Sequence, residues 1–294
     1  MNLINLGNQP WCNDYQRKKL KTYPLKVYFC NNCFGAQLSY FLKKEKMFSN
    51  NYYLSGDNKE LNKHFKKIST LIINKFKNQK LVHAKKILDI GSNDGSFLKN
   101  FKKDWQKLGI EPSKKAINIA KKNKVQSLKT YFNYKIAEKL NTEFDVIHAS
   151  GVFFHLEELI SCIKGVKLLL RTRGLFIIQF INLNEIIEKN HFDQIYHEHL
   201  YYYNLNSLQM LLKRFDLEIF DATKSLIHGG STIAYVSHKG IYKNTRRLEK
   251  FKNKETKNTN KLLKKVKKFE ANVKLIKVNF LKLANYYKNH NYNI

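Results

Sequence analysis

The segment ILDIGSNDG, residues 87–95, joins a predicted strand to a predicted helix. Its two glycines lack a Cβ, so a ligand can approach the backbone of this loop closely. The helix expected over residues 96–103 would present the free N–H groups of its first turn to a carboxylate or phosphate. Glu111 ends the next predicted strand, where a carboxylate can bind both hydroxyls of a ribose. The loop therefore predicts a nucleoside-binding site, the alternative being a plain tight turn with a solvated Glu111.

The glycine spacing selects among nucleoside ligands. A dinucleotide fingerprint needs a glycine where this loop carries Asn93, because the middle glycine admits the pyrophosphate. A ligand with a ribose and an amino-acid tail but no pyrophosphate fits better, and S-adenosylmethionine is such a ligand. Asp89 or Asp94 would face its ammonium or sulfonium group. The predicted cofactor-binding residues are Asp89, Gly91, Asn93, Asp94, Gly95 and Glu111.

Strands and helices alternate on both sides of the loop. The predicted strands are residues 86–90, 108–111, 144–149 and 174–181, and the further predicted helices are residues 113–122 and 157–170. Such alternation is typical of a parallel sheet covered by helices. Two last strands, residues 217–222 and 231–238, have too short a link for a crossover and should pair antiparallel. The sequence thus predicts an α/β fold with a Rossmann-like class I methyltransferase sheet, mostly parallel with a terminal antiparallel pair.

Composition shifts divide the chain into three predicted parts. Residues 1–80 hold a small, irregular module, with a strand at residues 25–29 and a helix at residues 59–76, and residues 81–240 form the S-adenosylmethionine-binding domain. Residues 241–294 are a Lys/Asn-rich tail whose apolar residues from Leu262 to Tyr287 recur at spacings of four and three. That spacing predicts an amphipathic helix. The helix either covers its own chain or leans on another domain or subunit.

Composition also bounds the class of protein. With 43% hydrophobic residues the chain can build a core, which excludes a wholly disordered protein. The longest apolar run, residues 175–181, is too short to span a membrane, and no signal peptide is visible, so a cytoplasmic protein is expected. The net charge of +31 comes almost wholly from Lys, with only six Arg. Because phosphate recognition favours the planar fork of Arg, nucleic acid is not the expected partner.

A cluster of acid–base groups follows the predicted strand at residues 174–181, where loops line the ligand crevice of open α/β sheets. Tyr196, His197, Glu198 and His199 supply groups that exchange protons near neutral pH. In an extended segment Tyr196 and Glu198 would share one face, and the two histidines the other. His155 follows the predicted strand at residues 144–149 and should point into the same crevice. A metal site at the His-x-His pair and a chance polar loop are the alternatives.

With these residues in hand, the chain resembles the sugar C-methyltransferase family from about Leu6 to Phe280. The run FDQIYHEHLYYYNL is long and unusual, whereas the glycine loop is shared by many methyltransferases. The resemblance implies S-adenosylmethionine-dependent methylation of a carbon of a nucleotide-linked keto-deoxysugar. The segments that carry it are LGNQP (6–10), YPLKVYFCNNC (23–33), FSNNYYLSG (48–56), LDIGSNDGSFL (88–98), GIEPS (109–113), GVFFHLEEL (151–159), FDQIYHEHLYYYNL (192–205) and HGGS (228–231).

The resemblance also implies roles for residues. His199 would remove a proton from the carbon next to a ketone, giving an enolate that attacks the methyl group in line. Tyr53, or else Tyr52, would hydrogen-bond the sugar near the reacting carbon, and His155 would assist at a sugar oxygen. The implied catalytic residues are His199, Glu198, Tyr196, His155 and Tyr53.

The sequence departs from the family at several places. Cys30 and Cys33 give only half of the family's zinc site, and Cys12 stands at the wrong place to complete it. The second Rossmann-like domain of the family is expected to be absent, which makes a separate protein carrying that domain an implied partner. Two other functions stay open: a non-catalytic or partner-dependent subunit that retains cofactor binding, and a nucleic-acid methyltransferase.

Overall fold

A seven-stranded sheet forms the centre of the molecule. The computed structural model describes residues 1–12, 20–49, 53–77, 84–257 and 259–292, so Tyr52 lies outside the described residues. The strand order is β10-β11-β8-β7-β4-β5-β6, and β11 runs antiparallel to both of its neighbours. The predicted α/β fold, mostly parallel with a terminal antiparallel pair, is confirmed. The strands are β4 (Lys85–Ile90), β5 (Trp105–Ile110), β6 (Gln126–Leu128), β7 (Phe144–Ser150), β8 (Leu170–Ile181), β10 (Leu217–Ser225) and β11 (Ser231–His238).

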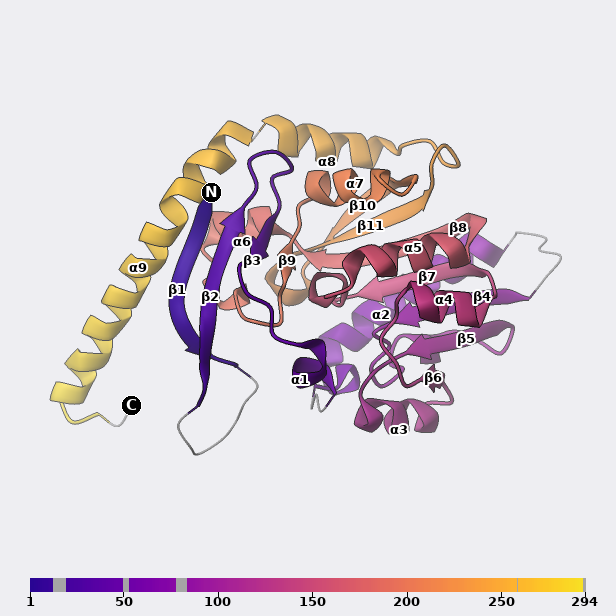
Figure 1. The fold of residues 1–294 in the computed structure, drawn as a ribbon, viewed down its shortest axis with the longest axis horizontal. Coiled ribbons are helices and arrows are strands. Elements are labelled where there is room, and N and C mark those ends of the chain that lie inside the picture. The colour runs from indigo at the N-terminus through magenta and orange to yellow at the C-terminus, as the bar shows by residue number, and fades with distance from the viewer. Residues whose placement is uncertain (13–19, 50–52, 78–83, 258, 293–294) are drawn as a thin grey trace.

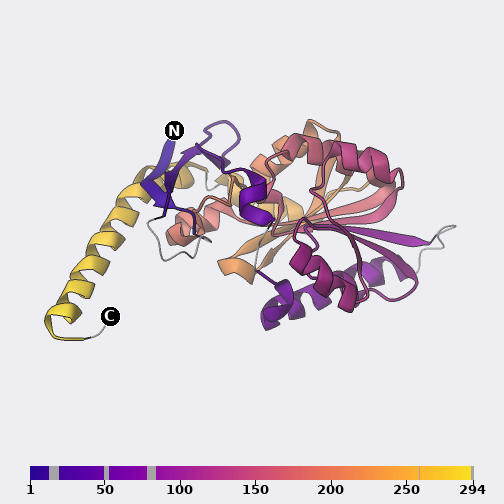
Figure 2. The ribbon, with the colours of Figure 1, turned by 60° about the horizontal axis from the view of Figure 1, so that its bottom comes forward.

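Helices cover both faces of this sheet (Figures 1 and 2). One face packs against α4 (Tyr134–Leu140), α5 (Leu159–Leu169) and α7 (Leu205–Lys213). The other face packs against α2 (Lys59–Lys77), whose Leu61, Phe65 and Ile68 are buried. α3 (Lys114–Lys122) follows β5. Burial on both faces explains why the central strands are continuously apolar.

The helix predicted over residues 96–103 is wrong. The chain there makes turns and a short 3-10 helix, Leu98–Asn100, while Phe97, Leu98 and Phe101 are buried. The Asn100 side-chain amide donates to the carbonyls of Ser96 and Phe97. The face that a helix after β4 would cover is instead occupied by α2, which the sequence placed in the N-terminal part.

A second, four-stranded antiparallel sheet has the order β1-β2-β3-β9. The predicted strand at residues 25–29 lies within β2, but the stretch before it is not irregular, because residues 2–10 also form a strand. β9 belongs to the methyltransferase part of the chain and follows His199 almost directly, so this sheet is tied to the predicted catalytic segment. The elements are β1 (Asn2–Pro10), β2 (Thr22–Phe29), β3 (Ala36–Leu38), α1 (Lys44–Phe48) and β9 (Tyr201–Tyr202).

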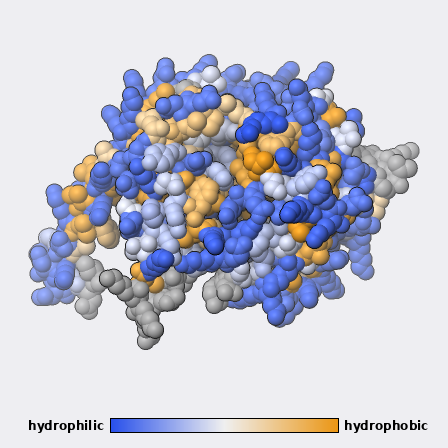
Figure 3. Space-filling view, in the orientation of Figure 1, coloured by the Kyte–Doolittle hydropathy of each residue, from blue (hydrophilic) through white to orange (hydrophobic). Residues whose placement is uncertain are grey.

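The tail is helical, as predicted, in α8 (Arg246–Lys257) and α9 (Thr259–Asn289). Figure 1 shows α9 running along β1 and beyond it, at the edge farthest from the central sheet. Its first half buries Leu262, Val266 and Phe269 and contacts β1 and α6 (Leu183–Lys189). Its second half leaves Phe280 67% exposed, and hydrophobic atoms appear along this edge in Figure 3. The division at residues 80 and 240 stays a prediction.

No helix within the described ranges combines the length and the apolar character needed to cross a membrane.

Candidate active site

A cleft of about 620 Å³ lies at the carboxyl ends of the central strands. The glycine loop and the residues after β5 form one side, and the segments after β7 and β8 form the other. This is the ligand-binding edge of an open α/β sheet. The predicted site residues that line the cleft are Tyr53, Gly91, Asn93, Glu111, His155, Tyr196, Glu198 and His199.

The glycine loop has the backbone that its sequence suggests. Gly91 has a φ of 71°, and a Cβ built on it would meet Val152 Cγ2 at 2.7 Å. Asn93, which stands where a dinucleotide site has glycine, has a φ of 47°. Asn is one of the few side chains that tolerate this left-handed conformation. The loop therefore keeps a tight turn although its middle glycine is missing.

The predicted helix N-terminus is not present, because no α-helix follows the loop. The N–H groups of the loop already have partners within the chain: Asn93 N donates to Glu111 Oε2 at 3.0 Å, and Gly95 N donates to the carbonyl of Ser92 at 3.0 Å. Asp94 N donates to Asn93 Oδ1 at 2.9 Å. The expectation that this turn offers several free N–H groups to an anion is therefore wrong.

Three of the predicted cofactor-binding residues support the loop instead of lining the cleft. Asp89 is buried and bonded to His148 Nδ1 at 2.7 Å, and burial raises the pKa of its carboxyl. Asp94 is buried and accepts a hydrogen bond from Gly56 N at 2.7 Å. Gly95 faces Val125, which a Cβ would approach to 3.0 Å. Neither carboxylate is among the residues that line the cleft, and the expectation that one of them faces the cationic end of the cofactor stays a prediction.

Glu111 has the properties of a ribose ligand. Its two carboxylate oxygens accept hydrogen bonds from the backbone N–H groups of Asn93 and Ser113, at 3.0 and 2.8 Å. Each oxygen keeps a second lone pair, and the residue lines the cleft. Burial raises the pKa of Glu111 to about 6. With Pro112 and Phe132 as an apolar wall beside it, these residues fit the nucleoside part of S-adenosylmethionine.

The histidine segment folds as a turn, so the predicted extended arrangement is wrong. His199 N donates to the carbonyl of Tyr196 at 3.0 Å, which brings the two rings together with centroids 4.0 Å apart. His197 turns away, and its Nε2 donates to the carbonyl of Tyr23 at 3.3 Å. The two histidines therefore do not share a face. Tyr196, Glu198 and His199 line the cleft, and His197 braces the N-terminal sheet.

Backbone carbonyls fix the tautomers of the two histidines in the cleft. His199 Nδ1 lies 2.8 Å from the carbonyl of Gln194, and His155 Nδ1 lies 2.5 Å from the carbonyl of Glu198. A carbonyl only accepts, so each Nδ1 carries the proton and each Nε2 carries a lone pair. Burial lowers the pKa of His155 to about 4 and lowers that of His199 well below its usual value. Both imidazoles are therefore neutral at pH 7.

Tyr53 lines the cleft next to the glycine loop. The Asn93 side chain holds this segment, donating from Nδ2 to the carbonyl of Tyr53 at 3.0 Å and accepting from Ser55 N at 2.9 Å. Tyr53 is 49% exposed and lines the cleft.

The phenol of Tyr196 also lines the cleft. Burial raises its pKa, so it stays protonated and can donate a hydrogen bond.

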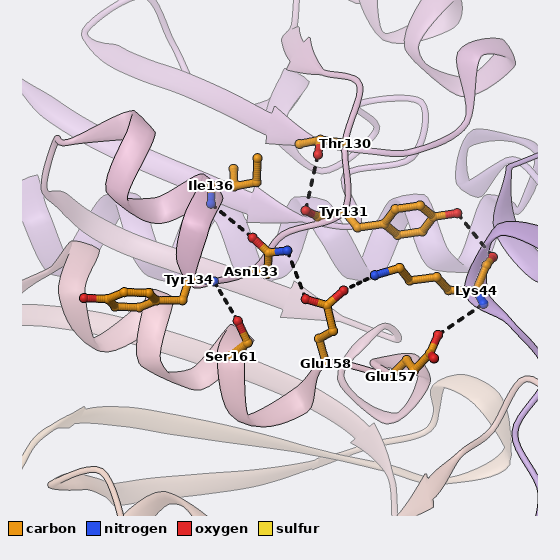
Figure 4. Close-up of polar contacts among 9 residues, drawn as sticks. All are labelled: Lys44, Thr130, Tyr131, Asn133, Tyr134, Ile136, Glu157, Glu158 and Ser161. Carbon is orange, nitrogen blue, oxygen red and sulfur yellow. Dashed lines mark hydrogen bonds and ion pairs between the residues drawn. The ribbon is translucent and has the colours of Figure 1, made fainter.

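Two residues from the N-terminal module also line the cleft and were missed in the sequence. Trp11 Nε1 donates to Glu198 Oε1 at 2.9 Å. Lys44 pairs with Glu158, its backbone N donates to Glu157 at 3.3 Å, and its carbonyl accepts from the Tyr131 hydroxyl at 3.2 Å (Figure 4). No local pattern links such distant positions, although Trp11 directly follows the stretch LGNQP, which contributed to the resemblance.

His228 is a third missed residue in the cleft. It sits in the β10–β11 link with a φ of 56°, an uncommon conformation for a non-glycine residue. Its ring is close enough to His155 and His199 to lower the pKa of both. The sequence did contain a signal for His228, because the segment HGGS (228–231) already contributed to the resemblance.

The cysteines do not fit a structural zinc ion. Cys30 and Cys33 lie at one end of the β1–β2 hairpin, and Cys12 lies at the other end, next to the cleft. A hairpin of this length separates the two ends by roughly 25 Å. In the described part of the chain no three His, Cys, Asp or Glu side chains come together to hold a metal. Structural zinc needs four ligands, of which two are here.

Comparison with known proteins identifies two families. Residues 53–222 match a family described as "Methyltransferase domain", and residues 1–48 match one described as "Putative zinc binding domain". Among curated proteins, the C-methyltransferase NovU of Streptomyces niveus is 25% identical over 219 residues. The match covers 73% of this chain and 51% of the relative, so the chain spans about half the length of that protein.

Two solved structures illustrate the breadth of structural similarity. An S-adenosylmethionine-dependent methyltransferase from Clostridium acetobutylicum is 16% identical, with a TM-score of 0.47 over 60% of this chain and 92% of that one. The magnesium protoporphyrin IX methyltransferase of Synechocystis is 14% identical, with a TM-score of 0.46 over 59% of this chain and 83% of that one.

Proposed function

The chain belongs to the family of methyltransferase domains, with S-adenosylmethionine as its methyl donor, and from that premise we propose that it methylates a carbon atom of a nucleotide-linked keto-deoxysugar. One observation carries the proposal. A neutral imidazole, His199, has its Nε2 lone pair available in the same cleft that holds Gly91 and Glu111. Similarity to a C-methyltransferase over the matched half of that relative supports it.

The proposed chemistry begins with a proton transfer. A C–H bond next to a ketone is acidic enough for a positioned base to break it. His199 Nε2 takes this proton, and the C–H electron pair becomes the enolate. S-adenosylmethionine supplies an electrophilic methyl group on its sulfonium. The enolate carbon would then form a C–C bond to that methyl group as the C–S bond breaks, with the electron pair of the broken bond leaving on the thioether sulfur of S-adenosylhomocysteine. Positioning in the cleft provides most of the rate enhancement.

The residues around His199 suit its change of charge. The ring of Tyr196, at 4.0 Å, can stabilise the imidazolium that forms, and Phe154 lies against the same ring at 4.6 Å. The neutral phenols of Tyr196 and Tyr53 can donate to the enolate oxygen. His155 has no proton on Nε2, so it accepts from a sugar hydroxyl rather than donating to the enolate.

The decisive experiment separates proton removal from methyl transfer. A thymidine- or cytidine-diphosphate keto-deoxysugar is incubated in D₂O without S-adenosylmethionine, and exchange of the C–H next to the ketone is followed by NMR. We expect exchange with the unaltered protein. His199→Gln should lower it by roughly 10³-fold or more, because Gln cannot take up the proton, a loss within the range for a catalytic base.

A matched control comes from the same segment. His197→Gln keeps a donor for the carbonyl of Tyr23 and lies outside the cleft, so exchange should stay within about twofold of the unaltered protein. Calorimetry with S-adenosylmethionine checks that both variants bind the cofactor. Cofactor binding without exchange or methylation of any sugar nucleotide would contradict the proposal and favour a subunit that only binds the cofactor.

A further inference from the structure

We propose that Trp11, in the N-terminal module, is a positioning residue of the reaction, acting through the carboxylate of Glu198. The inference rests on the proposed function and extends it. It gives a residue near the amino terminus a part in the proposed reaction.

The contact is specific and structurally supported. The indole N–H, which can only donate, lies 2.9 Å from Glu198 Oε1, and Glu198 is 6% exposed. Lys46 of α1 holds the indole from the other side, with its ammonium 5.7 Å from the ring centroid. The same ammonium donates to the Tyr23 hydroxyl at 2.7 Å. Trp11 is therefore fixed by both the hairpin and α1.

Glu198 connects Trp11 to both imidazoles. Its carbonyl accepts from His155 Nδ1 at 2.5 Å, and it directly precedes His199. Its carboxylate is close enough to Tyr196 to raise the pKa of that phenol. A shift of this carboxylate would move the chain that holds the two histidines, so the indole N–H limits how far the base can depart from its working geometry.

The test uses the full chain and a double-mutant cycle. Trp11→Phe keeps an aromatic ring but removes the N–H donor. We expect about a 10-fold loss of the C–H exchange rate, the scale of one hydrogen bond to a charged group, with S-adenosylmethionine affinity unchanged within twofold. In a Glu198→Ala background the same change should have no further effect, because its target is gone.

A second readout does not need activity. The chain has two tryptophans, and Trp105 is buried against Phe76 and Phe101 at the start of β5, the end of that strand opposite the cleft. Trp105→Phe should leave exchange unchanged, and it makes Trp11 the one remaining tryptophan. In that background Glu198→Ala should shift the Trp11 emission maximum, whereas Glu60→Ala, on the surface of α2, should not.

The outcomes separate the two hypotheses. Exchange at the unaltered rate in Trp11→Phe, or an equal loss with and without Glu198, would overturn the positioning role. If the emission maximum of Trp11 does not change in Glu198→Ala, the hydrogen bond between Trp11 and Glu198 is contradicted. If the unaltered protein catalyses no exchange while the emission still responds to Glu198→Ala, the proposed function fails, and Trp11 loses its role in that reaction although the contact stands.

Discussion

The two sides of the cleft are built in different ways. The cofactor side comes mostly from residues 91–111, in which the backbone N–H of Gly91 bonds to the carbonyl of Ile110 and that of Asn93 bonds to the carboxylate of Glu111. The histidine side draws on segments far apart in the chain, from Trp11 through His155 to His199 and His228. Local geometry shapes the first side, and long-range packing of the N-terminal sheet shapes the second.

This difference implies that the two sides can be damaged independently. A change in the loop backbone should affect cofactor binding and leave proton removal intact, while a change in the histidine segment should do the reverse. The C–H exchange reaction and cofactor calorimetry measure the two sides separately.

Gly91→Ala should give the largest effect and break the cofactor side. A left-handed φ costs about 1–2 kcal/mol for a residue with a Cβ, and overpacking against Val152 costs about 1–3 kcal/mol more. We expect the free energy of unfolding in urea to fall by roughly 2–5 kcal/mol and cofactor affinity to fall with it. C–H exchange by the molecules that remain folded should survive.

Gly151→Ala is the matched control for this prediction. Gly151 has a φ of 66° with nothing within 4 Å of a built Cβ, so it carries the strain without the clash. Its loss of stability should stay near 1–2 kcal/mol. Equal losses in the two variants would show that Val152 yields easily and that close packing at Gly91 is not required.

The same difference explains which features the sequence could predict. The strands 86–90 and 144–149, the terminal pair and the helix at residues 59–76 follow from hydrophobic patterns of short range. Gly91 and Glu111 follow from the spacing of the loop and the next strand. The helix at residues 96–103 failed because α2, a segment distant in the chain, covers the face that it would have occupied.

The position of the histidine segment at the cleft followed from its place after a predicted strand, whereas the roles of its residues came from a resemblance. The period-two pattern of an extended segment put His197 beside His199, whereas a turn separates them. The turn leads into β9, which pairs with β3 far away in the chain, and the Trp11 contact spans 187 residues. No pattern within a short window carries such information, so these contacts required the three-dimensional structure.

Lowering the pH should weaken cofactor binding through Glu111. Its pKa of about 6 means that the carboxylate is largely protonated at pH 5, so S-adenosylmethionine affinity should fall about 10-fold between pH 7.5 and pH 5. Calorimetry at both pH values measures this, and Glu111→Gln should bind weakly with a flat profile. A steep profile in the Gln variant would assign the titration to another group.

Stability should respond to Glu111 with the opposite sign. A carboxyl whose pKa is raised from 4.5 to about 6 binds its proton more tightly in the folded state. Its contribution to the free energy of unfolding therefore rises as the pH falls through this window, by up to about 2 kcal/mol. Urea unfolding of the protein and of Glu111→Gln at pH 4.5 and pH 7 isolates this contribution.

The histidine side should resist moderate acid. The pKa of His199 is held well below 6.5 by burial and by His155, so the proposed base stays neutral as the pH falls to 6. The exchange rate should drop less than twofold between pH 7.5 and 6.0, whereas an ordinary imidazole would lose about fourfold. If the exchange rate falls fourfold, and still does so when each of the other histidines is replaced, then the pKa of His199 lies near its ordinary value.

Lys44 should give the smallest effect, although it borders the cleft. Its ion pair with Glu158 is partly solvated, the Glu158 side chain being 42% exposed, so Lys44→Met should cost about 0.2–1 kcal/mol of stability. The contacts of its backbone with Glu157 and Tyr131 survive the substitution, and Asn133 still donates to Glu158 at 3.0 Å (Figure 4). Cofactor affinity should therefore change by no more than about threefold.

Lys63→Met is the control, because it removes an ion pair with Glu60 that lies wholly on the surface. A loss of affinity above about 10-fold would show that the Lys44 charge itself acts on the ligand, and the cofactor side would then depend on the N-terminal module as the histidine side does.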